Sequence, residues 1–165
     1  FPPRVAESPL RVSEVQVNLG GTWNGTAFAG GRVVSSECKT LEYKLANSME
    51  TNFRIGAGGG YACSAFRGGR VQTLTMSREM RDYILQNLLD QSDTFGVRIL
   101  AEGAEFDAGH KYTVEMIFPR VGVLKAPISV DGKRLAEAGE FTVLEDSTYG
   151  SAIVRVKNLV AQYAA

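Results

Sequence analysis

The feature that most constrains this sequence is a pair of neighbouring segments with alternating side chains. In residues 94–101, Phe95, Val97 and Ile99 face one way, and in residues 111–118 the alternation is strict, with Tyr112, Val114, Met116 and Phe118 on one face. Side chains that alternate in this way point to opposite faces of a β-strand. An acidic turn over residues 102–110 separates the two segments. The pattern predicts an antiparallel β-hairpin with one buried face. We expect Pro119 to end the second strand, because proline cannot donate to the hydrogen-bond ladder.

One segment has a clear helical period, residues 77–92. Its predicted core-facing stripe is formed by four side chains at spacings i, i+3, i+4 and i+8, namely Met80, Tyr83, Ile84 and Leu88. Ser77 has the side chain of a good N-cap. Because strand-like sequence lies before and after this segment, the sequence predicts a mainly β (α+β) protein with one helix packed against a sheet.

Further strands are predicted where apolar residues alternate or cluster between turn signals, at residues 11–19, 32–47, 50–55, 71–76, 141–145 and 153–159. Asn24-Gly25 and Asp131-Gly132 are strong turn signals. A length of 165 residues favours one domain. We expect residues 1–30 to form an amino-terminal arm with the first strand and turn, and residues 31–165 to form the core.

Composition excludes several classes of function. The 18 Lys and Arg residues balance 18 Asp and Glu residues, which argues against a dedicated nucleic-acid binder with a strong basic footprint. No apolar run approaches the roughly 18 residues of a membrane helix. No signal peptide is apparent. The chain begins Phe-Pro-Pro without methionine, which leaves open a processed product or a piece of a longer protein.

The residues that usually carry chemistry are scattered. His110 is the sole histidine and falls in a predicted hairpin turn, so we expect it at the surface. Cys38, Cys63 and His110 lack the spacing of metal ligands, and we expect the two cysteines to be reduced. The glycine-rich loop at residues 56–60 is followed by Tyr61 where a phosphate-binding G-x-G-x-x-G would need glycine. We therefore expect no enzyme, no cofactor and no metal.

Four stretches occur in a distinctive order. They are Leu-Glu-Tyr-Lys-Leu-Ala-Asn-Ser at residues 41–48, the loop-to-strand segment at residues 64–75, Ile-Phe-Pro-Arg-Val at residues 117–121, and the final turn and strand at residues 146–159. In this order they resemble the tail tube proteins of long-tailed bacteriophages, especially the siphophage type. Together they cover most of residues 30–160. None is a catalytic motif, and the specificity of the match comes from order and spacing.

This resemblance implies an antiparallel β-sandwich or open barrel flanked by one helix. It also implies a structural subunit whose copies form stacked rings, commonly six-fold, with sheets that merge around a lumen. A free strand edge is a template for further pairing, and a heterologous contact repeated around an axis closes a ring. The implied partners are further copies, the tape measure, tail terminator and distal tail proteins, and double-stranded DNA that passes without specific binding. The implied location is the virion tail, assembled in the host bacterial cytoplasm, with no membrane.

The resemblance suggests roles for two sets of residues. A lumen that lets DNA slide should be polar and acidic, since carboxylates repel phosphates. The candidates on predicted polar faces or turns are Glu42, Glu50, Glu102, Glu105 and Glu115, each of which could equally be an ordinary solvated acid. Stacking of rings needs loops that reach the next ring, and the candidate loop consists of Gly56, Gly58, Gly59, Gly60 and Tyr61.

Two alternatives stay open at this point. The first is the inner-tube protein of a contractile injection or secretion device, which shares the implied fold. The second is a β-sandwich module that binds carbohydrate or another ligand. Such a module needs exposed aromatic rings, for which the candidates are Trp23, Tyr61 and Phe66.

Overall fold

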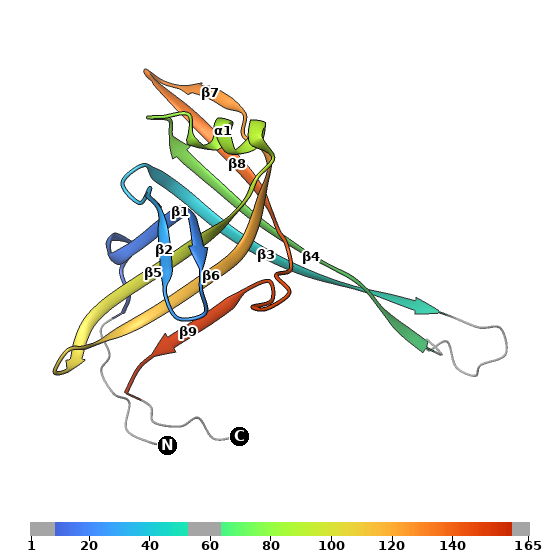
Figure 1. Cartoon of the computed structure of the whole chain (residues 1–165), viewed down its shortest axis with the longest axis horizontal. Helices are drawn as coiled ribbons and strands as arrows, with labels where there is room; N and C mark the ends of the chain where they lie inside the picture. The colour runs from blue at the N-terminus through green and yellow to red at the C-terminus, as the bar shows by residue number, and fades with distance from the viewer. Residues whose placement is uncertain (1–8, 53–63, 160–165) are drawn as a thin grey trace.

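The computed structural model describes residues 9–52 and 64–159, apart from the side chains of residues 52 and 64–67. Strands dominate this part of the chain, and it contains one α-helix (Figure 1). The elements in order are η1 (Val12–Glu14, a 3₁₀ turn), β1 (Val15–Trp23), β2 (Phe28–Val33), β3 (Cys38–Asn52), β4 (Ser64–Glu79), α1 (Ile84–Gln91), β5 (Thr94–Asp107), β6 (His110–Lys125), β7 (Ile128–Asp131), β8 (Arg134–Val143) and β9 (Ile153–Lys157).

All the strand pairs are antiparallel, in the order β2-β1-β5-β6-β8-β4-β3, with β7 beside β8 and β9 beside β6. Strand β6 belongs to two layers. Its first half pairs with β9, and its second half pairs with β8. The strands β2, β1, β5 and β9 lie with the first half of β6, whereas β3, β4 and β8 lie with the second half. The predicted β-sandwich or open barrel with one flanking helix is confirmed.

The core lies between the two layers. Leu19, Val97 and Phe118 face it from one layer, and Leu74 and Phe141 face it from the other. The ring centroids of Tyr43 and Phe118 lie 5.0 Å apart across the core. Burial of apolar surface is the main stabilising force in such a sandwich. The alternation in the sequence therefore places Val97 and Phe118 on the core face correctly, whereas Leu100 and Ile117 on the opposite face are buried as well.

The predicted hairpin is confirmed, and it is longer than expected. Val97 pairs with Phe118, and the strands continue to the outer pair of Asp107 and His110. Pro119 does not end the second strand, which runs on to Lys125. The register shifts here, so that residues 119 and 120 face the single residue 96. This β-bulge accommodates a proline, because one residue of a bulge makes no ladder hydrogen bond.

The predicted helix at 77–92 is wrong in its first half. Residues 77–79 continue β4, with Ser77 opposite Ala138, because pairing with β8 stabilises the extended backbone there. Helix α1 begins at Ile84, and Tyr83 is 66% exposed rather than on the buried face. Ile84 and Leu88 pack against the core, whereas Met80 lies before the helix and its N–H donates to the Leu135 carbonyl oxygen. The fully buried side chain of α1 is Leu85.

Other strand boundaries also differ from the prediction. The segment predicted as 32–47 spans the end of β2, a turn and the first part of the long strand β3. Of the segment predicted as 50–55, residues 50–52 continue β3, and residues 53–55 lie outside the described residues. The predicted strand at 71–76 is the second half of β4. The turn at Asp131-Gly132 is confirmed, and Gly132 has a φ of +64°, a conformation that glycine adopts without strain. Long cross-strand pairing explains why the strands exceed their local sequence signals.

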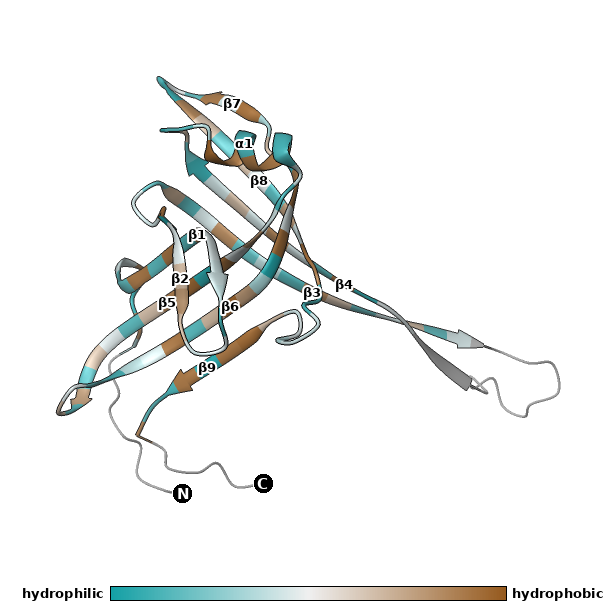
Figure 2. Cartoon of the chain, in the orientation of Figure 1, coloured by the Kyte–Doolittle hydropathy of each residue, from teal (hydrophilic) through white to brown (hydrophobic). Residues whose placement is uncertain are grey.

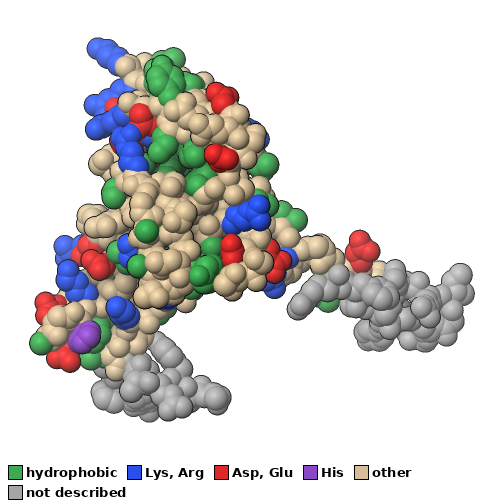
Figure 3. Space-filling view, in the orientation of Figure 1, with side chains coloured by type: hydrophobic (Ala, Val, Ile, Leu, Met, Phe, Trp, Pro, Cys, Tyr) green, Lys and Arg blue, Asp and Glu red, His purple; other side chains and the backbone are tan. Residues whose placement is uncertain are grey.

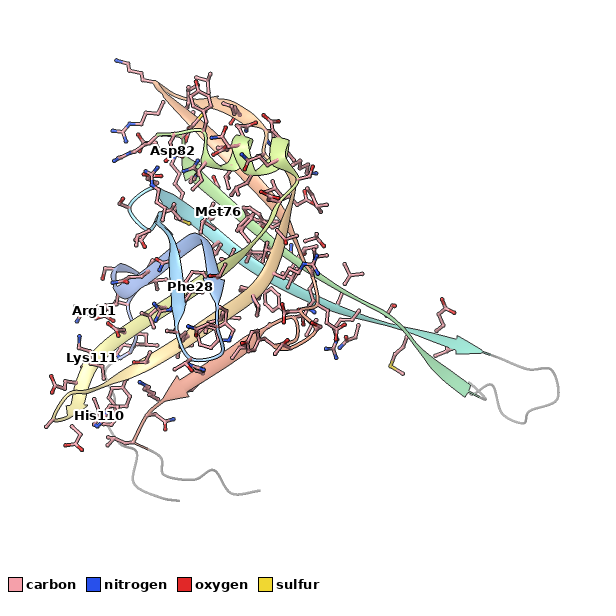
Figure 4. The ribbon with its side chains drawn as sticks, viewed as in Figure 1. Arg11, Phe28, Met76, Asp82, His110 and Lys111 are labelled. Atoms are coloured by element: carbon pink, nitrogen blue, oxygen red, sulfur yellow. The ribbon has the colours of Figure 1, made fainter. Side chains whose placement is uncertain are left out.

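A buried ionic cluster fixes the passage from β4 to α1. Arg78 is fully buried, and its guanidinium lies 2.7 Å from Glu137 Oε2, 3.0 Å from Glu37 Oε2 and 2.9 Å from Asp82 Oδ1. Arg32 contacts both Glu37 and Asp82 from the surface. We call these five residues the Arg78 cluster. Asp82, labelled in Figure 4, also accepts the backbone N–H of Ile84 at the start of α1, at 3.1 Å.

Candidate assembly surface

The part of the chain that the structure describes contains no group of three or more His, Cys, Asp or Glu side chains placed to hold a metal ion. His110 is exposed at the tip of the β5–β6 hairpin, where its ring stacks on Phe106 at 6.3 Å (Figure 4). Burial raises the pKa of the Cys38 thiol, which disfavours its reactive thiolate form. None of the helices within residues 9–52 and 64–159 is long and apolar enough to cross a membrane.

The most distinctive surface is a two-stranded arm, which we call the ribbon. It consists of residues 45–52 of β3 and residues 64–72 of β4. Strand β4 pairs with β8 only from Thr73 onward, so the two ribbon strands pair with each other alone among the described strands. Figure 1 shows the ribbon projecting away from the rest of the molecule. At about 3.3 Å per residue, eight residues of strand span roughly 25 Å.

The ribbon has its own hydrogen bonds but little apolar packing. The Ser48 hydroxyl donates to the Gly69 carbonyl oxygen at 3.0 Å, and Arg70 Nε donates to Asn47 Oδ1 at 3.1 Å. Leu45, Met49 and Val71 are exposed by 49%, 67% and 59%. An isolated two-stranded hairpin is marginally stable in water. Packing of another chain against the exposed side chains of the ribbon would therefore stabilise it.

Several strand edges have no partner among the described strands. Strands β2 and β3 end the path of paired strands, β7 pairs with β8 alone, and β9 pairs with β6 alone. Strand β9 is strongly hydrophobic in Figure 2, yet Val154 and Val156 are 60% and 57% exposed. Unpaired backbone groups at a sheet edge are templates for pairing with another chain. The fold thus presents both free edges and exposed apolar side chains for self-association.

The five acidic residues predicted to line a lumen do not share one surface. Glu42 and Glu50 lie exposed on β3, whereas Glu102 and Glu105 lie exposed near the tip of the β5–β6 hairpin. Glu115 is only 12% exposed, accepts a hydrogen bond from Arg98 Nε at 2.6 Å and lies 3.9 Å from Arg155. Its carboxylate is thus neutralised within the sheet. A lining role for these residues stays a prediction.

The loop predicted to reach a neighbouring ring lies outside the described residues. It comprises Gly56, Gly58, Gly59, Gly60 and Tyr61. In the sequence these residues join β3 to β4, the two strands of the ribbon.

Of the three aromatic side chains considered for a ligand-binding module, the structure describes that of Trp23, which is buried. Trp23 is 8% exposed, and its ring meets the Tyr149 ring edge-on at 6.5 Å. The Arg155 guanidinium lies 4.6 Å from the Trp23 ring centroid, a cation–π contact. Tyr61 and the side chain of Phe66 lie outside the described residues. Trp23 therefore serves to tie the β1–β2 turn to β9.

Sequence reasoning missed the ribbon. The alternation of Leu41, Tyr43 and Leu45 predicts one half-buried face, and Leu41 and Tyr43 do pack against the core. Leu45 lies exposed, because β8 ends beside Thr73 and the core does not extend further along β3. Alternation shows that a strand has an apolar face. It does not show where the covering layer stops.

Figure 3 shows acidic and basic side chains at several places on this face of the body, with a group of Lys and Arg side chains at its upper left. Thirteen ion pairs join such side chains in the described residues, including Lys125 with Glu140 at 2.7 Å and Lys44 with Glu42 at 3.1 Å. Mutual neutralisation of this kind agrees with the absence of net charge in the sequence.

No protein-family model matches the sequence, and no curated protein matches it. Among solved structures, the tail tube of SPP1 superposes with a TM-score of 0.57 at 8% identity, over 90% of this chain and 80% of that one. Hcp1 from E. coli EAEC 042 gives 0.44 at 12% identity, over 87% and 97% of the two chains. The anti-feeding prophage baseplate gives 0.43 at 10% identity, over 96% and 94%. The first of these comparisons shows that the chain has a phage tail tube-like fold.

Proposed function

We propose that this chain, which has a phage tail tube-like fold, is the structural subunit of a phage tail tube of the siphophage type. Copies of it associate into rings, the rings stack, and the stack forms the hollow conduit through which DNA leaves the virion during infection. The protein acts by assembly and carries out no catalysis.

The observation that carries this proposal is the ribbon together with the free edge of β3. The ribbon exposes Leu45, Met49 and Val71 and has no covering layer in its own described chain. A protein that stayed monomeric would gain little stability from such an arm, because a two-stranded hairpin is marginal by itself. A neighbouring copy that packs on the ribbon supplies the missing apolar contacts.

Ring formation follows from the positions of the free edges. The unpaired edge of β3 and the unpaired edge of β7 lie on different strands, so a contact that joins them is heterologous. A heterologous contact closes into a ring when the rotation between copies divides a full turn. We propose six copies per ring, with the loop Gly56–Tyr61 and the ribbon reaching the next ring.

The further parts of the proposal concern partners and location. The tube would meet a tape measure protein inside it, a terminator at one end and a distal tail protein at the other. Its location would be the virion tail, after assembly in the cytoplasm of the host bacterium. The likeness in fold to the SPP1 tail tube supports self-association.

Negative-stain electron microscopy of the purified chain over a series of concentrations tests the proposal. We expect rings or tubes of uniform diameter at high concentration. A ligand-binding module would instead remain monomeric in sedimentation at every concentration, and that result would overturn the proposal.

A further inference from the structure

The layer formed by β3, β4 and β8 has one face that no described element covers. Three rows of opposed residues cross it, in which Thr40 faces Ser77, Glu42 faces Thr75, and Lys44 faces Thr73. Two of these rows continue onto β8, where Thr75 faces Glu140 and Thr73 faces Thr142. Glu140 in turn faces Lys125 on β6. We call this surface the hydroxyl face, after Thr40, Thr73, Thr75, Ser77 and Thr142. A shallow hollow of about 210 Å³ lies on it, lined in part by Thr40, Thr75 and Glu140.

Three lysines on this face and at its rim are each held by a carboxylate. Lys44 Nζ lies 3.1 Å from Glu42, and Lys125 Nζ lies 2.7 Å from Glu140. At the rim, Lys39 Nζ lies 2.5 Å from Asp131, and this hydrogen bond lowers the pKa of Asp131. The three positive and three negative charges cancel. A lysine that is paired in this way attracts phosphate much less than a free one.

The opposite face of the same layer carries the body of the molecule. Leu74, Met76 and Phe141 point from it into the core, and α1 packs there through Leu85, which lies beside Gly139. If copies join through the free edges of β3 and β7, one face of this layer must turn toward the ring axis. The body cannot occupy the axis of a hollow tube. The hydroxyl face therefore turns inward.

We infer that the hydroxyl face lines the channel of the assembled tube, and that Glu42, Glu140 and Asp131 neutralise its lysines so that duplex DNA passes without binding. This inference rests on the proposed function. It replaces an acidic, repelling lining with a neutral one built of short hydroxyl side chains. Of the five acids first considered for the lining, only Glu42 lies in the three rows that define this face.

Site-specific labelling of assembled tubes tests the position of this face. Thr40→Cys, made in a Cys38→Ser, Cys63→Ser background, places a thiol at an exposed position of the hydroxyl face. Asn87→Cys in the same background places one at an exposed position of α1, on the side of the body. After labelling with maleimide-gold, we expect density in the central channel for the first variant and on the outer wall for the second. Gold on the outer wall for Thr40→Cys would overturn the inference.

Charge substitution tests the neutralising role. Glu42→Gln combined with Glu140→Gln frees Lys44 and Lys125, and we expect tubes of this variant to retain short duplex DNA about tenfold more than wild-type tubes at about 50 mM salt. Retention should fall steeply as salt rises. Glu102→Gln combined with Glu105→Gln removes the same charge at the tip of the β5–β6 hairpin and should leave retention at the wild-type level. Equal retention by both variants would show a general charge effect and contradict the role.

Failure of the proposed function and failure of this inference give different experimental results. If the wild-type chain forms no rings or tubes, the proposed function fails. If it forms tubes whose hydroxyl face is labelled from outside, or whose Glu42→Gln, Glu140→Gln variant ignores DNA, only this inference fails.

Discussion

Arg78 shows how a single buried charge can hold three elements together. Its guanidinium bonds Glu37 before β3, Asp82 before α1 and Glu137 on β8, and both Arg78 and Glu137 are fully buried. A buried ion pair is not by itself strongly stabilising, because both charges lose their hydration. Removal of one partner is costly, since it leaves the others buried and unpaired.

We therefore expect Arg78→Met to lower the free energy of unfolding by about 3–5 kcal/mol in chemical denaturation. Arg81→Met is the matched control, because Arg81 is 54% exposed and lies 3.7 Å from Glu79. That control should cost less than about 1 kcal/mol. If the two variants prove equally stable, the Arg78 cluster does not fix the β4–α1 passage.

Gly139 marks a close approach of α1 to the sheet. A Cβ atom there would lie 2.6 Å from the Phe141 ring and 3.1 Å from Leu85 Cδ1, and both neighbours are fully buried. We expect Gly139→Ala to destabilise the fold by about 1–3 kcal/mol through overpacking. Gly69→Ala, where the added Cβ meets nothing within 4 Å, should be close to neutral in the same thermal unfolding experiment. An unchanged stability of Gly139→Ala would mean that α1 sits farther from β8.

At the scale of elements, the turn between β8 and β9 depends on one carboxylate. Asp146 accepts the backbone N–H groups of Thr148 and Tyr149 at 2.9 and 3.0 Å. These hydrogen bonds, with a smaller contribution from Arg120, lower the pKa of Asp146. Because the folded pKa lies below the unfolded one, the stabilisation is fully present above the unfolded value of about 3.9. It is lost as the pH falls through the folded pKa.

Asp146→Ala should therefore lower Tm at neutral pH, and the difference from wild type should shrink as the pH falls below about 4. Asp146→Asn is the control, since its amide oxygen can accept the same two N–H groups without titrating over this range. At neutral pH its Tm should lie between those of Asp146→Ala and wild type, because it keeps the acceptor but lacks the charge. A deficit of Asp146→Ala that stayed constant down to about pH 2 would rule out the charged carboxylate as its source.

The elements also show how far local sequence can predict this fold. Alternation at residues 94–101 and 111–118 was enough to predict the central hairpin, because its side-chain pattern has the period of a strand with one buried face. The helix was misplaced because residues 77–83 carry helix-compatible side chains, and pairing of Ser77 and Glu79 with β8 overrides that local preference. Long-range pairing of this kind leaves no local signal.

The assembly surface was less predictable than the fold. Glycines at 56–60 predict a loop, but no local pattern indicates that β3 and β4 extend beyond the strand that covers them. The hydroxyl face could not be predicted from the sequence either. Its residues come from four strands, and only the register brings Glu42, Thr75, Glu140 and Lys125 into one row.

At the scale of the whole molecule, we expect the ribbon to be needed for assembly but not for folding of the rest of the chain. Replacement of residues 47–70 by a two-residue Asn-Gly turn would join Ala46 to Val71, which already face each other. Because this variant keeps Gln72 and its hydrogen bond with Tyr43, and removes Met49, which is 67% exposed, we expect it to keep a Tm within a few degrees of wild type. It should lose tube formation, measured by sedimentation at high concentration. Tubes formed by this variant would contradict a role for the ribbon in assembly.

The most direct test of self-association through free edges is electron cryomicroscopy of the concentrated wild-type chain. The account predicts a hollow tube in which the β3 edge and the ribbon of each subunit contact a neighbouring copy. Particles that remain single copies at every concentration, or a tube in which both surfaces face solvent, would contradict it.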